Sequence, residues 1–151
     1  MTALRFVNIF TAGVAAGGLF VVLFSYARAL PKLPSTEIGR LHGLIHPPTH
    51  VTMQGATMIG AGTAVAIGVW DDPSARASTV LVFAGIIGAA IQAVLSRFWV
   101  VPWSDEMIAW PEKGVPSDYL AFLKRWTTFH AGRVFGAFLA FTCYLLSALL
   151  A

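Results

Sequence analysis

Long apolar runs separated by short polar segments dominate the hydrophobic pattern of this chain. Four such runs cover residues of about 3–30, 48–70, 77–100 and 128–151. Each is close to the roughly 20 residues that an α-helix needs to cross a bilayer. The pattern therefore predicts an all-α membrane protein, a bundle of four transmembrane helices that forms a single domain over residues 1–151.

Prolines mark the expected boundaries of the second helix. Ser35 begins a short amphipathic helix between helices 1 and 2, which extends to about Ile45. Pro47 and Pro48 each lack a backbone donor and disfavour α geometry in the residue before them. We therefore expect a corner at this point, with the second membrane helix starting at about Pro48, in the first helical turn where proline is tolerated.

Two further connections are expected beyond the second run. A tight turn is predicted at residues 71–74, where Asp, Pro and Ser cluster. Pro102 is expected to end the third helix and to open an interfacial loop that extends to Pro116, because this stretch mixes aromatic and charged residues.

Composition and charge are typical of a membrane protein and argue against a soluble domain or a nucleic-acid-binding protein. Of the 151 residues, 57% are hydrophobic and only 11% are charged, whereas about a quarter of a typical soluble domain is charged. The basic residues are scattered at the ends of runs, so the net charge of +3 does not indicate a nucleic-acid partner. Eight of the ten Lys and Arg residues fall on the face opposite the termini. By the positive-inside rule that face is cytoplasmic, and the termini lie outside a bacterial inner (plasma) membrane.

Small and amide residues inside the runs predict how the helices associate. Gly13 and Gly17 form a GxxxG pair, and a second small-residue face includes Gly85 and Gly88. Such faces allow close approach of helices within the bundle or in a homo-oligomer. Gln54 and Gln92 are expected to bond each other across helices.

Histidines are the main candidate chemistry. Three of the four, His42, His46 and His50, are spaced four residues apart, and His130 reaches the same membrane face from the fourth helix. Imidazole is the commonest metal ligand, and nitrogen-rich sites suit copper, zinc or iron, or an axial position on haem. Each histidine taken alone could equally be an interfacial residue that bonds a backbone carbonyl. The set of four predicts a copper, iron or haem site.

Several neighbours complete the predicted site. Arg133 follows His130 on nearly the same helix face and could snorkel to the interface or bind an anionic group. We expect it to be held by Asp105, by Glu106 or by an anion, and Asp105 could also act as a catalytic carboxylate. Gln54 and Trp126 join His50 and His130 as candidate cofactor-binding residues. Gln54 lies one helical turn beyond His50 on the same face, and Trp126 could belong to an interfacial aromatic belt or form the wall of a pocket for a flat aromatic group.

Short motifs spread over nearly the whole chain resemble the anthrone oxygenase-like family of small four-span membrane proteins. They are Gly17-Gly18-Leu19-Phe20, Leu30-Pro31 with Leu33-Pro34, Val101-Pro102-Trp103, and Trp126 followed by Phe129-His130-Ala131-Gly132-Arg133. The Trp, His and Arg of the last motif map onto Trp126, His130 and Arg133. Ser104 departs from the family pattern, which usually has asparagine there.

The resemblance implies an oxidoreductase that oxidises a hydrophobic, often polycyclic aromatic, substrate with dioxygen. Together with the histidines it predicts a membrane-embedded oxygenase with catalytic residues His130, Arg133 and Asp105, in contact with membrane lipid. The alternative is a non-enzymatic metal- or haem-binding subunit, or an assembly partner in a larger complex.

Overall fold

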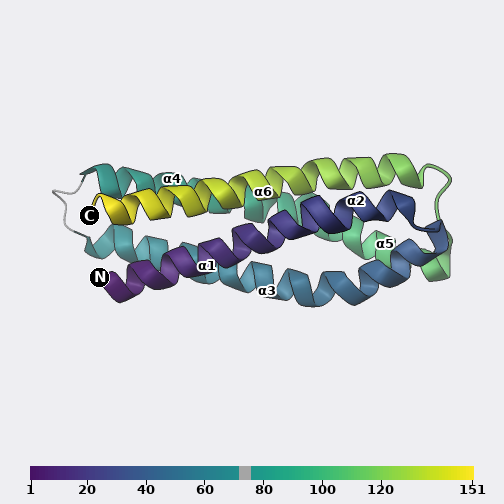
Figure 1. The fold of residues 1–151 in the computed structure, drawn as a ribbon, viewed down its shortest axis with the longest axis horizontal. Helices are drawn as coiled ribbons and strands as arrows, with labels where there is room; N and C mark the ends of the chain where they lie inside the picture. Colours follow the sequence, from purple (N-terminus) through teal and green to yellow (C-terminus); the bar gives the residue numbers. More distant parts are fainter. Residues whose placement is uncertain (72–75) are drawn as a thin grey trace.

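Four helical rods lie side by side along most of their length, with both chain termini at one end of the bundle (Figure 1). The structure, a computed structural model, describes residues 1–71 and 76–151, and these residues form helices without strands. The elements in chain order are α1 (Thr2–Val21), the π-helical turn η1 (Val22–Tyr26), α2 (Ala27–Ala29), the 3₁₀ turn η2 (Leu30–Lys32), α3 (Ser35–Trp70), α4 (Arg76–Leu95), the π-helical turn η3 (Ser96–Val100), α5 (Val101–Lys113) and α6 (Tyr119–Leu149).

Three rods are long and apolar enough to cross a membrane by length and composition. They comprise Thr2–Lys32, Arg76–Lys113 and Tyr119–Leu149, and each greatly exceeds the roughly 20 residues that a bilayer requires. The prediction of an all-helical chain with membrane-type helices is therefore confirmed. Residues 72–74 of the expected turn lie outside the described residues. Asp71, the first residue of that turn, directly follows α3.

The corner predicted at Pro47 and Pro48 is wrong, because α3 runs uninterrupted through both prolines. The separate short amphipathic helix is likewise absent from the described residues, since residues 35–45 are the first part of α3. Packing explains the difference: a Cβ on Gly39 would lie 2.6 Å from the carbonyl oxygen of Met107, so α3 and α5 are in close contact. Both prolines are exposed. Tertiary contact therefore holds a helix that the local sequence disfavours.

The loop predicted over 102–116 is mostly helix. The π turn η3 connects α4 to α5, and within it the backbone N–H of Val101 donates to the carbonyl of Ser96, five residues earlier. Pro102 then falls in the first turn of α5, where its missing N–H is tolerated. The chain leaves the helix only at Gly114, whose φ of 89° is a left-handed conformation that glycine adopts readily.

Small residues bring α4 and α6 into backbone contact, as their pattern predicted. A Cβ on Gly88 would lie 2.7 Å from the carbonyl oxygen of Gly136, and a Cβ on Gly136 would lie equally close to the carbonyl oxygen of Gly88. Gly17 has open space around its Cα, so only Gly13 of the GxxxG pair packs closely, against Phe141. The small residues of the third apolar run are thus used inside the bundle.

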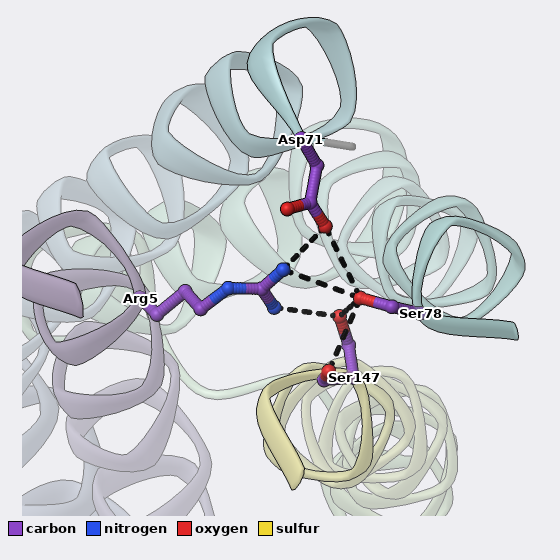
Figure 2. A network of polar contacts seen from close by, with 4 residues as sticks. All are labelled: Arg5, Asp71, Ser78 and Ser147. Atoms are coloured by element: carbon purple, nitrogen blue, oxygen red, sulfur yellow. Dashed lines mark hydrogen bonds and ion pairs between the residues drawn. The ribbon is translucent and has the colours of Figure 1, made fainter. Parts of the chain in front are cut away.

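A polar cluster joins all four rods at the end that holds the termini. Figure 2 shows the guanidinium of Arg5 on α1 directed between Asp71, Ser78 and Ser147, which belong to the end of α3, to α4 and to α6. Arg5 forms an ion pair with Asp71 and donates to the hydroxyl oxygens of Ser147 at 3.1 Å and Ser78 at 3.3 Å. We call these four residues the Arg5 cluster. They fix the relative positions of the four helices at this end.

Candidate functional site

Three histidine rings form a column on one face of α3, near the opposite end of the bundle. The ring centroids of His42 and His46 are 5.0 Å apart, and those of His46 and His50 are 5.4 Å apart, with interplanar angles of 13° and 16°. This stacking follows directly from the uninterrupted helix, because residues four apart lie one above the other on one face. A corner at Pro47 would have separated His50 from the other two.

Tyr26 and Trp126 hold the first ring of this column. The hydroxyl of Tyr26 and Nδ1 of His42 are hydrogen-bonded at 2.7 Å, and the ring of Trp126 meets His42 edge-on at 5.5 Å. His42 is only 1% exposed. It is therefore a fixed side chain within the helix packing, and its role is to position the column.

His130 and Arg133 approach the column from α6, and both are buried. Nε2 of His130 donates to the carbonyl oxygen of Leu19 at 3.2 Å, and Nη1 of Arg133 donates to Nδ1 of His130 at 3.4 Å. Both ring nitrogens of His130 are thus occupied, with the proton on Nε2 and a lone pair on Nδ1. This arrangement requires a neutral imidazole.

Trp126 is also anchored, and Ser104 is its partner. The indole stacks on His130 at 5.2 Å and 15°, and its N–H donates to the hydroxyl oxygen of Ser104 at 3.0 Å. That hydroxyl donates in turn to the carbonyl of Val100 at 2.7 Å. Ser104, singled out as a departure from the family pattern, supplies the acceptor that fixes Trp126 against His130.

A small buried cavity lies between α1, η1, α3 and α6, with a volume of about 20 Å³. The apolar side chains on its walls include Leu19, Val22 and Met53. Four nitrogen-bearing side chains also line it: His46, His50, His130 and Arg133. Three buried atoms of its lining residues have no hydrogen-bond partner in the described part of the chain: Nε2 of His46, Nδ1 of His50 and Nε of Arg133; Nε2 of His42, in the same column, also lacks one. We call it the inner cavity. It takes about one or two molecules the size of water.

Arg133 brings a positive charge to this cavity without an acidic partner. Its side chain is 4% exposed, yet the ion pairs of the described residues join only Arg5 to Asp71 and Arg125 to Asp118. Asp105, the predicted carboxylate, is exposed on α5 and forms no hydrogen bond or ion pair with a described residue. Arg133 therefore places a positive charge beside the inner cavity that has no ion-pair partner among the described residues.

A larger pocket of about 220 Å³ lies on the other side of His50, between α3 and the junction of α4 with η3. Polar residues on its walls are His50, Gln54, Ser96 and Arg97. We call it the outer pocket. The predicted bond between Gln54 and Gln92 is wrong, because Gln92 bonds Thr57 instead, at 2.8 Å between Nε2 and Oγ1. Oε1 of Gln54 is buried without a partner among the described residues.

The two π turns found in residues 1–71 and 76–151 supply residues to these two spaces. Val22 and Tyr26 of η1 line the inner cavity, and Ser96 and Arg97 of η3 line the outer pocket. π turns inside α-helices are rare and occur often at functional sites. The sequence carries no composition signal for either turn, so Arg97 was missed as a site residue.

The arrangement does not fit the predicted cofactors. No group of three or more His, Cys, Asp or Glu side chains within the described residues is placed to hold a metal ion. His42, His46 and His50 are stacked ring on ring, and His130 uses both of its nitrogens. Haem needs far more room than the inner cavity offers, since organic ligands occupy pockets of about 300–1,000 Å³. We therefore derive no chemical step through a metal or haem.

The chain matches no protein-family model, no curated protein and no solved structure. The function must accordingly be argued from the site and from the short motifs quoted above.

Proposed function

We propose that the chain is a membrane-embedded oxidoreductase that oxidises a hydrophobic aromatic substrate with dioxygen. This proposal rests on three buried nitrogen atoms without hydrogen-bond partners among the described residues, which belong to His46, His50 and Arg133 in the lining of one small cavity. Buried polar groups without partners are costly and rare in native proteins, and perturbed clusters of this kind concentrate at functional sites. The substrate class comes from the resemblance to anthrone oxygenases.

The proposal includes a fourth membrane span over residues 48–70 of α3. Five large apolar side chains on its outer face are between 52% and 71% exposed: Val51, Met58, Ile59, Val65 and Val69. Such a surface is suited to lipid contact. Glycines and threonines in the same segment lower its mean hydropathy without adding charge.

The orientation is proposed on charge. The eight basic residues at or towards the histidine end are Arg28, Lys32, Arg40, Arg97, Lys113, Lys124, Arg125 and Arg133. The other two are Arg5, near the start of α1 and bonded to Ser147, and Arg76, the first residue of α4, so both belong to the end with the termini. The positive-inside rule then gives a plasma-membrane protein, bacterial in the simplest case, with the histidine end cytoplasmic and the termini outside.

His50 and Arg133 carry the proposed chemistry. A substrate in the outer pocket contacts His50, whose imidazole accepts a proton from an acidic C–H next to an aryl ketone. Dioxygen reacts with the resulting carbanion beside His50, the residue that lines both spaces, and the guanidinium of Arg133 stabilises the negative charge that develops on oxygen.

The reaction balances without a further reductant. A methylene carbon loses two hydrogens and four electrons, one oxygen atom becomes the new carbonyl, and the other leaves as water with the two hydrogens. The substrate therefore supplies all the electrons that dioxygen requires. His50 returns its proton to the reduced oxygen, which restores the neutral ring.

Oxygen uptake by purified protein in detergent, with anthrone as the test substrate, checks the proposal. Wild type should consume oxygen, and Arg133→Lys should lower kcat about 100-fold, because lysine keeps the charge but loses the fixed fork of donors. Arg125→Gln is the matched control. It removes a charge from an exposed ion pair on the same helix and should leave uptake unchanged. A folded wild type that consumes no oxygen with any aryl ketone would favour the binding-subunit alternative.

A further inference from the structure

The inner cavity is lined by a charged side chain and is too small to hold an organic substrate. Arg133 is always protonated, is 4% exposed and has no acidic partner among the described residues. A charge in such surroundings needs a partner, because its desolvation is expensive. At about 20 Å³ the cavity admits only an occupant of one or two heavy atoms.

Hydrogen-bond chemistry gives the sign of this occupant. Nε of Arg133 always carries a proton and can only donate. The unpaired nitrogens of His46 and His50 can each carry the single proton of a neutral imidazole, since that proton occupies either ring nitrogen. Three such donors then belong to residues that line this one cavity, whereas no carboxylate belongs to its lining residues. Apolar walls formed by Leu19, Val22 and Met53 lower the local dielectric and strengthen the attraction.

We propose that the inner cavity is a binding site for one small inorganic anion, chloride or another ion of similar size, held by Arg133, His46 and His50. His130 positions Arg133 through its Nδ1, which accepts from Nη1 of the guanidinium, and so leaves Nε free for the anion. Anion binding does not require the proposed oxidation, although both use Arg133 and His50. If both hold, the anion competes with the reduced oxygen species for Arg133, and chloride inhibits oxygen uptake.

Chloride and gluconate at equal sodium concentration provide the test, because gluconate is too large for the cavity. The melting midpoint of the detergent-purified wild type should rise saturably with chloride and not with gluconate. Broadening of the chloride NMR line should saturate over the same range. Both measurements are made without substrate, so they can fail or succeed whatever the oxygen electrode shows.

Arg133→Gln should weaken chloride binding about 10- to 100-fold, as expected for the loss of a charged hydrogen bond. Arg97→Gln is the matched control, because it removes the same charge from the outer pocket and should leave chloride binding unchanged. If Arg133→Gln does not fold, the single variants His46→Phe and His50→Phe are tested in its place. Each removes one hydrogen-bond donor and keeps an aromatic ring, so each should weaken chloride binding severalfold. Equal midpoints of the wild type in chloride and gluconate, or equal loss of binding in Arg97→Gln, would overturn the proposal.

Discussion

Each end of the bundle buries an arginine, and the two arginines have opposite surroundings. Arg5 contacts one carboxylate and two hydroxyls, from three other helical rods. Arg133 contacts one neutral imidazole on its own helix and keeps an unpaired Nε. A satisfied buried charge fixes the positions of helices, whereas an unsatisfied one costs stability and is retained where a ligand compensates for it. The contrast indicates a structural role for the end that holds Arg5 and a ligand-binding role for the end that holds Arg133.

Arg5→Gln should have the largest effect on stability. It leaves the carboxylate of Asp71 buried without its cation, which costs about 3 kcal/mol. Oxygen uptake per folded molecule should not change, because the Arg5 cluster lies at the opposite end from the histidines. Chemical unfolding in detergent measures the loss.

Asp71→Asn provides the control for that substitution. In the double variant Arg5→Gln, Asp71→Asn no unpaired charge remains, so part of the loss should be recovered. A double variant as unstable as the sum of the two single ones would show that the two side chains do not interact. Arg133→Met, at the other end, should by contrast leave stability unchanged or raise it.

A smaller effect is expected from Ser104→Ala at the histidine end. The substitution leaves the buried indole N–H of Trp126 without its acceptor, which costs about 1–2 kcal/mol. Trp126 stacks on His130, so the fluorescence of this tryptophan should shift as well. Unchanged stability and fluorescence would mean that Ser104 does not anchor the indole.

Pro48→Ala should have the smallest effect and the opposite sign. Alanine supplies the N–H that the carbonyl of Leu44 lacks and relieves the steric restriction on the preceding residue. The greater flexibility of the unfolded chain offsets much of this gain, so we expect a rise of about 0.5 kcal/mol in the free energy of unfolding. A fall would mean that the restriction proline places on the unfolded chain outweighs the regained hydrogen bond.

Residue patterns predicted the helical class and the approach of His130 to the histidines of α3, because long apolar runs and fixed helical spacing dictate both. They did not predict the continuity of α3 through Pro47, since that depends on contact between Gly39 and a helix more than sixty residues away in the chain. The Arg5 cluster was missed for the same reason. A lone arginine near a membrane end carries no local sign of partners on three other rods.

The π turns make the histidine end sensitive to chain length. In a π turn a backbone N–H donates to the carbonyl five residues earlier, so the turn contains one residue more than an α-helical turn. Deleting one residue from η1 or η3 would therefore yield an ordinary α-helix. Everything beyond the deletion would then rotate by about 100° around the helix axis. After a deletion in η1, Tyr26 would no longer face His42, and after one in η3, Ser104 would no longer face Trp126. Each π turn thus sets the rotational position of the helix that follows it, and a chain that lacked η1 would lose the wall it gives the inner cavity, whereas one that lacked η3 would lose the wall it gives the outer pocket.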